Sequence, residues 1–194
     1  MRSKFINKEN IQKLKKVIHG SEWLPLQLML ETGLRVGDAV KVKVKDIDLD
    51  DDGQYWLNYT AEKTKKKGRA KLTEGLAKRL TEGKKRNQYC FGSYGKRGHL
   101  TRQAVWYRMK NSAKSCGISG DGLSPHSLRK IFAVSLLHEK GLEAVQQALQ
   151  HNNDAVTKIY AYADTVMKES PDEPIRWRDL ETLVSYILDR IKEV

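Results

Sequence analysis

Residues 124–160 read SPHSLRKIFAVSLLHEKGLEAVQQALQHNNDAVTKIY, and this stretch decides how the rest of the chain is interpreted. Proline is tolerated at the first position of a helix and disfavours a helical residue before it, so a helix is predicted to begin at Pro125 or His126. His126 and Arg129 are then neighbours on one helix face, where they are able to bind one anion together.

The remainder of this stretch is also predicted to be helical. A core helix over Ser127–Lys140 is closed by Gly141, and Leu142–Gln150 forms the next helix. A last helix follows His151 and carries Tyr160 at the edge of its buried face. One arginine, two histidines and a late tyrosine are an unusual set for a structural core.

Composition describes a soluble globular protein of one domain with a small appendage. The 194 residues are 31% charged and 39% hydrophobic, which is sufficient for a sizeable core. No apolar run approaches the roughly 20 residues of a membrane span, and the N-terminus has no signal-peptide pattern. The two cysteines, Cys90 and Cys116, form no disulfide framework, which is typical of a cytosolic protein with reduced thiols.

The positive charge is concentrated in one part of the chain. The net charge is +12, and the segment from Thr60 to Lys110 holds 16 Lys and Arg against 3 acidic residues. A basic block within a globular domain indicates a polyanionic partner, with nucleic acid as the leading candidate. The alternative is an ordinary solvated surface.

Two helices are predicted before this block, over Ile6–Ile18 and over Glu22–Glu31 with Ser21 as its N-cap. The second helix is apolar nearly all round and is therefore central. Arg35 follows it closely, where a cation needs an ion pair or an anionic ligand. The spacing permits an ion pair with Asp38, and the two interpretations are compatible.

A small antiparallel sheet is predicted at the start of the basic block, with its first strand just before Thr60, and helices are predicted to follow it. The acidic run Asp46–Gly53 is expected to be a turn, and the first clear strand is Gln54–Tyr59. The sequence then predicts a hairpin tip over Lys63–Arg69, a returning strand over Ala70–Leu72, and helices over Glu74–Lys85 and Thr101–Lys114. The predicted fold class is α+β, mainly helical.

These motifs together resemble the catalytic domain of the tyrosine recombinase, or phage integrase, family. The resemblance covers roughly residues 5 to 165, and His151 and Tyr160 are nine positions apart, as is usual in the family. The motifs that carry it are Thr32-Gly33-Leu34-Arg35, the Lys63 hairpin, His126-Ser127-Leu128-Arg129, Leu149-Gln150-His151 and Tyr160.

The resemblance implies a role for each catalytic residue. Arg35 and Arg129 bind the phosphate, His126 and His151 support them, Lys63 is the general acid, and Tyr160 is the nucleophile. Lys65 remains an alternative general acid because it lies two residues from Lys63 on the same side of an extended strand. Tyr162 remains an alternative nucleophile.

The chemistry of these residue types agrees with the implied roles. Arginine forks stabilise the negative charge that gathers on a phosphodiester under attack. A tyrosine hydroxyl, with a reference pKa of about 10, needs neighbouring cations or a base to act as a nucleophile. The expected product is a covalent 3′-phosphotyrosyl link to DNA, with no metal and no cofactor, because neither His126 nor His151 has further ligands at zinc spacing.

Three positions depart from the usual pattern of the family. Gln150 stands where glycine is usual, and Tyr162 and Lys130 stand where histidine is frequent. None of these changes removes a catalytic group, although Gln150 alters the turn that precedes His151.

The sequence-based expectation is a site-specific recombinase that acts on double-stranded DNA. Its DNA-binding residues are expected to be Lys65, Lys66, Lys67, Arg69, Lys71 and Arg102. It is expected to be a homotetramer on DNA, a monomer in solution, and a protein of the bacterial or phage-host cytoplasm that associates with the nucleoid and not with membranes. A topoisomerase of the same chemistry, or a DNA-binding protein with a relic active site, are the alternative interpretations.

Residues 1–169 are predicted to form the catalytic domain, and residues 170–194 a linker with an amphipathic tail helix. The tail either packs on its own domain or passes to a neighbouring protomer. The separate N-terminal helical domain of larger recombinases is not recognised, so the chain is either a catalytic part of a longer protein or a small single-domain member.

Overall fold

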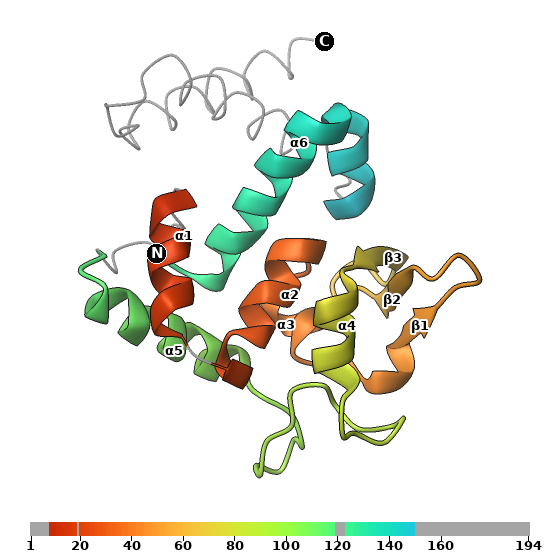
Figure 1. The fold of residues 1–194 in the computed structure, drawn as a ribbon, viewed down its shortest axis with the longest axis horizontal. Helices are drawn as coiled ribbons and strands as arrows, with labels where there is room; N and C mark the ends of the chain where they lie inside the picture. The colour runs from red at the N-terminus through yellow and green to blue at the C-terminus, as the bar shows by residue number, and fades with distance from the viewer. Residues whose placement is uncertain (1–7, 19, 119–122, 150–194) are drawn as a thin grey trace. The chain divides into compact units, whose positions relative to one another are not determined.

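The computed structural model describes residues 8–18, 20–118 and 123–149 of the chain (Figure 1). The predictions for His151, Tyr160, Tyr162 and the tail helix lie outside these residues, as does the domain boundary predicted after residue 169. The chain divides into two compact units, residues 1–132 and 133–194, and every residue of the candidate site described below belongs to the first unit.

The first unit is mainly helical, with one small sheet, as predicted (Figure 1). Among its described residues, the α-helices are α1 (Lys8–Val17), α2 (Leu24–Thr32), α3 (Val36–Ala39), α4 (Glu74–Thr81), α5 (Arg102–Ser115) and the start of α6 (Pro125–Leu149). Two short 3-10 helices, Gly20–Glu22 and Val44–Asp46, complete the helical elements of this unit. The short helix α3 was not predicted.

Helix α2 is the central element of this unit, as its nearly all-apolar sequence predicted. It contacts α3, α4 and β3. Ser21 does not cap it, contrary to the prediction, because Gly20–Glu22 forms a separate turn and the N-cap position is Trp23. Pro25 occupies the first turn, where its missing N–H group leaves no hydrogen bond unmade. The buried residues of α2 are Leu24, Pro25, Leu26, Leu28, Met29 and Thr32.

The sheet is antiparallel, in the order β1 (Ile47–Leu49), β2 (Tyr55–Thr60) and β3 (Lys67–Leu72). The acidic run from residue 46 to residue 53 therefore contains a strand, where only a turn was predicted. Strand β3 also begins three residues earlier than predicted, because Lys67 pairs with Thr60 and Arg69 with Asn58. The hairpin tip is correspondingly short, and two charged residues assigned to it lie in the strand.

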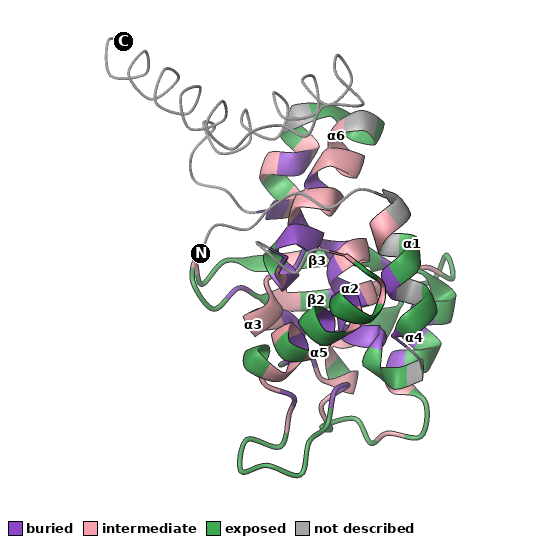
Figure 2. Cartoon of the chain, turned by 90° about the vertical axis from the view of Figure 1, so that its left-hand side faces the viewer, coloured by how far each residue is buried: buried purple, intermediate pink, exposed green. Residues whose placement is uncertain are grey.

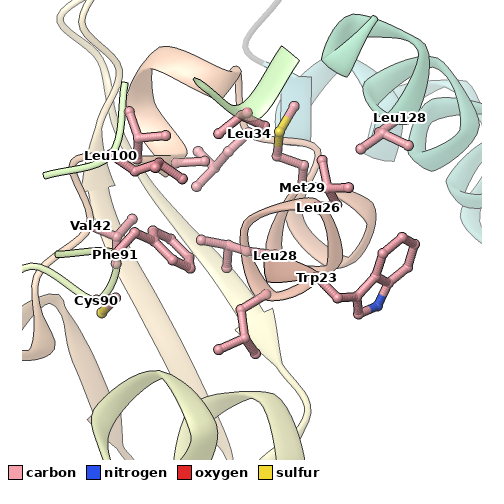
Figure 3. Packing of buried hydrophobic residues seen from close by; sticks show 14 of the residues in the cluster. Trp23, Leu26, Leu28, Met29, Leu34, Val42, Cys90, Phe91, Leu100 and Leu128 are labelled. Atoms are coloured by element: carbon pink, nitrogen blue, oxygen red, sulfur yellow. The ribbon is translucent and has the colours of Figure 1, made fainter. Parts of the chain in front are cut away.

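The core of the first unit is continuous from its first helix to its last (Figures 2 and 3). Figure 3 shows Leu26, Leu28 and Met29 of α2 among side chains from several other segments. The labelled neighbours are Trp23, Leu34, Val42, Cys90, Phe91, Leu100 and Leu128. Met109 of α5 is also buried in this core. This packing fixes the ends of α2 and α6, which carry the functional side chains.

Helix α6 begins at Pro125, as predicted. Gly141 interrupts it with φ 79° and ψ −177°, so two helical segments meet at the glycine that was predicted to end the first of them. Within the described part of the chain, α6 included, no helix combines the length and apolar character needed to span a membrane.

Candidate active site

The segment Thr32–Arg35 forms a well-determined turn at the end of α2. Gly33 adopts φ 66° and closes the helix through an N–H bond to the Met29 carbonyl, a left-handed conformation that glycine accepts without strain. Thr32 Oγ1 donates to the Leu28 carbonyl at 2.6 Å and accepts from the Leu34 N–H at 3.3 Å. With Leu34 buried in the core, the next residue, Arg35, is held at the start of α3.

The start of α6 is fixed by two local hydrogen bonds between Ser124 and Ser127. The Ser127 N–H donates to the Ser124 carbonyl at 2.8 Å, and the Ser124 N–H donates to Ser127 Oγ at 3.3 Å. Ser127 is fully buried. This reciprocal pairing resembles a capping box, in which the third helical residue bonds back to the cap. It sets the direction of the first helical turn, which carries His126 and Arg129.

Arg129 joins the start of α6 to the turn that follows α2. Its side chain is only 4% exposed, and its Nη1 donates to the carbonyl of Gly33. The glycine that positions Arg35 is therefore bound by the second predicted phosphate-binding arginine. A guanidinium held in a fixed orientation beside a pocket is suited to binding an anion, because its planar fork of donors matches the oxygens of a carboxylate or phosphate.

Lys63 lies in the loop between β2 and β3. The loop closes with two backbone hydrogen bonds, from Ala61 N–H to the Lys66 carbonyl at 2.9 Å and from Lys65 N–H to the Ala61 carbonyl at 2.8 Å. Lys65 adopts φ 57°, the left-handed conformation needed to turn the chain here. Lys63 and Lys65 are both exposed, in contrast to Arg129.

One pocket of about 450 Å³ brings together four of the six predicted catalytic residues, namely Arg35, Lys63, His126 and Arg129. Arg102, predicted to bind DNA, lines the same pocket. The four come from the α2–α3 turn, the β2–β3 loop and the start of α6. The other two, His151 and Tyr160, lie outside the described residues.

His126 is held in its neutral form by its surroundings. Partial burial of the imidazole lowers its pKa below the usual 6.5, and the charges of Lys130, Arg129 and Arg35 lower it further. The side chain is nevertheless exposed on its open side, where it lines the pocket. A neutral imidazole at pH 7 is able both to donate and to accept a hydrogen bond.

Lys130 stands one helical turn from His126, at the position where the sequence departs from the family pattern. Burial lowers the pKa of its amine to about 8. The side chain is half-buried and remains largely protonated at neutral pH. The site therefore holds a lysine whose charge depends on pH close to the physiological range.

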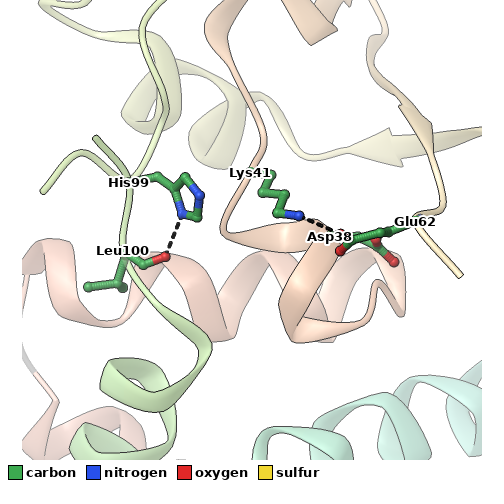
Figure 4. A network of polar contacts seen from close by, with 5 residues as sticks. All are labelled: Asp38, Lys41, Glu62, His99 and Leu100. Atoms are coloured by element: carbon green, nitrogen blue, oxygen red, sulfur yellow. Dashed lines mark hydrogen bonds and ion pairs between the residues drawn. The ribbon is translucent and has the colours of Figure 1, made fainter. Parts of the chain in front are cut away.

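Glu62 and Asp38 also line the pocket, and the sequence did not single out Glu62. The Glu62 N–H donates to Asp38 Oδ1 at 3.0 Å, and Glu62 Oε1 lies 2.8 Å from Lys41 Nζ (Figure 4). The spacing in the sequence permitted an ion pair between Asp38 and Arg35, and in the structure Asp38 binds the backbone of the lysine-bearing loop. One signal was readable in the sequence, since Glu62 is one of only 3 acids in the basic block and directly precedes Lys63.

Figure 4 also shows His99, which lies outside the pocket lining. Its Nδ1 lies 2.7 Å from the Leu100 carbonyl, so this nitrogen carries the proton and donates. The ring also lies against Tyr89, with 4.9 Å between the ring centroids. These contacts give His99 a structural role.

The remaining predicted DNA-binding residues lie on the hairpin. Lys67, Arg69 and Lys71 alternate along β3 on its exposed face, with Arg69 stacked 4.3 Å above the centre of the Trp56 ring. Lys66 is exposed beside the loop, and Lys65 lines a second pocket of about 300 Å³ next to the first. Among the described residues, no group of three His, Cys, Asp or Glu side chains is arranged to hold a metal ion.

Residues 4–166 match the model of the phage integrase family. The chain is 34% identical over 177 residues to tyrosine recombinase XerD of Listeria innocua, with 82% of this chain and 58% of the relative covered. It is 29% identical over 160 residues to tyrosine recombinase XerD of Yersinia pestis, with 72% and 49% covered. The chain thus spans about half the length of the curated relatives it matches.

Solved structures show the same fold at lower sequence identity. The catalytic domain of bacteriophage HP1 integrase aligns with a TM-score of 0.64 at 21% identity, covering 90% of this chain and 97% of that one. The recombinase XerH, in a structure titled as a post-cleavage complex with its difH substrate, aligns with a TM-score of 0.67 at 21% identity, covering 89% and 54%. The predicted fold is confirmed by these likenesses.

Proposed function

The chain belongs to the phage integrase family of tyrosine recombinases, and from that premise we propose that it cleaves and rejoins DNA strands at specific sites through a covalent 3′-phosphotyrosyl intermediate. The observation that carries the proposal is the pocket that Arg35, Lys63, His126 and Arg129 line together. Its lining is rich in cations, and a phosphodiester is an anion of matching hydrogen-bond geometry.

In the first step Tyr160 releases its phenolic proton to solvent, and its oxygen attacks the phosphorus of the scissile phosphodiester. The bond from phosphorus to the 5′ oxygen breaks, and that oxygen takes a proton from Lys63. The phosphate remains joined to the 3′ end and to the tyrosine. Arg35 and Arg129 stabilise the charge on the non-bridging oxygens during the attack.

The second step reverses the first with a new strand. A 5′ hydroxyl attacks the phosphorus of the phosphotyrosyl link and returns a proton to Lys63, while the bond to the tyrosine oxygen breaks and that oxygen takes a proton from solvent. The number of phosphoester bonds is conserved, so the reaction needs neither hydrolysis nor an external energy source. His126, neutral at pH 7, and His151 would support the phosphate by donating hydrogen bonds.

The fixed position of Arg129 agrees with this role. Transition-state stabilisation requires donors that are already oriented before the charge develops. Arg129 meets this requirement because it is buried and bonded to the Gly33 carbonyl. Arg35 is held by the same turn.

Double-stranded DNA is the proposed substrate, and a homotetramer on DNA the proposed assembly. The exposed lysines and arginine of β3 would bind the phosphate backbone without reading the sequence. A lambda integrase that resembles this chain, with a TM-score of 0.63, was solved as a tetramer bound to a Holliday junction. A DNA substrate would place the protein in the bacterial cytoplasm, with the nucleoid. The curated relatives are named tyrosine recombinases, which favours strand exchange over DNA relaxation by a topoisomerase.

The test is the capture of the covalent intermediate. The full chain is incubated with nicked duplexes carrying candidate sites, so that the short cleaved strand diffuses away and the protein–DNA adduct accumulates. We expect an adduct with the unmodified chain and none with Tyr160→Phe, while DNA affinity stays within a few-fold because phosphate contacts carry the binding. Tyr162→Phe is the matched control and should still form the adduct. Loss of the adduct in Tyr162→Phe alone would assign the nucleophile to Tyr162.

A further inference from the structure

A negatively charged side chain lies within the pocket proposed to bind DNA phosphate. Glu62 lines the pocket together with Arg35, Lys63 and Arg129. The other two acids of the basic block, Glu74 and Glu82, lie at the start and at the end of α4, and neither lines this pocket. A carboxylate here would repel the ligand, so its position needs an explanation.

Cations surround the Glu62 carboxylate. Its Oε1 lies 2.8 Å from Lys41 Nζ, and both side chains are about half exposed, at 57% and 46%. This hydrogen bond and the charge of Lys41 are the largest causes that hold the pKa of Glu62 below its usual range, and the charges of Lys65 and Arg102 add to them. The carboxylate therefore stays ionised throughout the neutral range.

Arg102 approaches the same place from α5. A Cβ atom added to Gly37 would meet Arg102 Cδ at 3.2 Å and Glu62 Oε2 at 3.8 Å, so all three groups share one small space. A larger residue at position 37 would displace Arg102. Lys41, from the segment after α3, thus binds the Glu62 carboxylate, and the charge of Arg102 from α5 also acts on it.

The carboxylate that Lys41 binds, and that Arg102 lies near, is supplied by the loop that carries Lys63. Glu62 directly precedes Lys63 in that loop, and its backbone N–H is bound to Asp38 Oδ1 at 3.0 Å. A DNA phosphodiester offers the same kind of oxygen acceptors as a carboxylate and, like it, carries one negative charge. The site of the Glu62 carboxylate is therefore suited to a DNA phosphate.

We propose that Lys41 and Arg102 form a second phosphate site beside the strand-cleavage pocket, and that Glu62 occupies this site until a DNA phosphate displaces it. This inference rests on the proposed function, because it takes DNA as the ligand. Displacement would exchange one ion pair for another and free the Lys63 loop from Lys41. Binding of the strand and release of the general acid would then be coupled.

The test is a comparison of DNA affinity between two variants with the same change of charge. Glu62→Gln removes the competing carboxylate, while Glu74→Gln removes an equally exposed carboxylate whose ion pair with Lys78, at 2.6 Å, lies outside the pocket. Affinity of the full chain for a fluorescent duplex of about 20 base pairs is measured by anisotropy at several salt concentrations. We expect Glu62→Gln to lower Kd by about 3- to 5-fold, the range that an exposed ion pair is worth, and Glu74→Gln by less than about 2-fold.

Lys41→Gln completes a double-mutant cycle. In the unmodified chain the charge of Lys41 is neutralised by Glu62, so replacing Lys41 should weaken DNA binding only slightly. In the Glu62→Gln background the lysine is available to phosphate, and the same substitution should remove the gain of about 3- to 5-fold. Equal effects of Glu62→Gln and Glu74→Gln, or equal costs of Lys41→Gln in both backgrounds, would overturn the proposal.

The adduct assay separates this proposal from the proposed function. A chain that shows the expected affinity differences but never forms a covalent adduct would retain the second phosphate site and lose the recombinase assignment. A chain that forms the adduct while Glu62→Gln binds DNA no better than Glu74→Gln would retain the assignment and lose the second phosphate site. Thermal unfolding of each variant confirms that it is folded.

Discussion

The pocket holds two kinds of cation, and they differ in how the fold supports them. Arg129 is 4% exposed and bound to the carbonyl of the turn that carries Arg35. Lys63 is exposed, on the loop between two strands. An arginine that stabilises charge has to be oriented before the reaction, whereas a lysine that delivers a proton has to meet the leaving oxygen once DNA is bound. The proposed mechanism assigns the buried arginine and the exposed lysine to these two different tasks.

The largest effect is expected from replacing Arg129, the buried member of the pair Arg129 and Lys63. Arg129→Ala should slow adduct formation by about 10²–10³-fold, because a preorganised charged donor is lost. It should also lower the free energy of unfolding by about 1–3 kcal/mol, since the buried Gly33 carbonyl loses a donor. Single-turnover adduct formation and urea unfolding measure the two effects.

Arg102→Ala is the matched control, because Arg102 is an exposed arginine of the same pocket. It should leave the free energy of unfolding within about 0.5 kcal/mol of the unmodified chain. If both variants unfold at the same urea concentration, the burial of Arg129 does not contribute to stability and the contrast between the two kinds of cation fails.

Replacement of Lys63 should affect the rate alone. Lys63→Ala should slow adduct formation on the order of 100-fold, the lower end for loss of a general acid, with little change in unfolding. A substrate whose 5′ leaving oxygen is replaced by sulfur should restore most of the rate, because a thiolate leaves without protonation. Rescue of Lys65→Ala instead of Lys63→Ala would transfer the role of general acid to Lys65.

Local rules made the ends of α2 and α6 predictable from the sequence. Gly33 ends a helix because it accepts a left-handed conformation, and Pro125 begins one because its ring fixes φ. Strand β1 was missed because its residues lie in an acidic run that resembles a turn. An acid beside it serves the fold, as Asp50 Oδ2 accepts from Trp56 Nε1 at 2.6 Å. Pairing with β2, rather than local preference, makes this segment a strand.

The site itself was predictable only in part. The sequence motifs identified Arg35, Lys63, His126 and Arg129, and the structure brings them to one pocket, while their roles remain proposals. Glu62 was not identified because its partners, Asp38 and Lys41, are 24 and 21 residues away and meet it only through the tertiary fold. A contact of that kind has no local signature.

A smaller effect is expected from the other lysines near the hairpin loop. In the triple variant, Lys65, Lys66 and Lys67 are each replaced by glutamine. This variant should bind all DNA sequences more weakly to the same extent, and its affinity should depend less steeply on salt. Each lost phosphate contact reduces the log–log slope by about 0.9. The control is the triple replacement of Lys84, Lys85 and Arg86, which follow α4 and carry the same charge. Equal slopes for the two triple variants would show that total charge, and not the hairpin, determines binding.

The smallest expected effect concerns the pH dependence of Lys130, which is half-buried one turn from His126. Burial lowers its pKa to about 8, whereas the ion pair with Glu74 raises the pKa of the exposed Lys78 above its usual value. Between pH 8 and about 10.5 the unfolded chain keeps a proton on residue 130 that the folded chain has lost, so the contribution of Lys130 to stability rises with pH in that window. The contribution of Lys78 is present below about pH 10.5 and is lost above its raised pKa.

Loss of the Lys130 charge should also weaken DNA binding slightly. We expect affinity of the unmodified chain to fall by about 2-fold between pH 7 and pH 9, because one positive charge beside the phosphate site is removed and salt screens most of its effect. In the Lys130→Gln variant the affinity for DNA should change less between pH 7 and pH 9, because only the other titratable groups of the chain contribute to the change. Carbon-13 NMR of dimethylated lysines follows both titrations directly. If the Lys130 resonance titrates together with that of Lys78, above about pH 10, Lys130 is solvated like a surface lysine, and the fall in affinity between pH 7 and pH 9 cannot come from its charge.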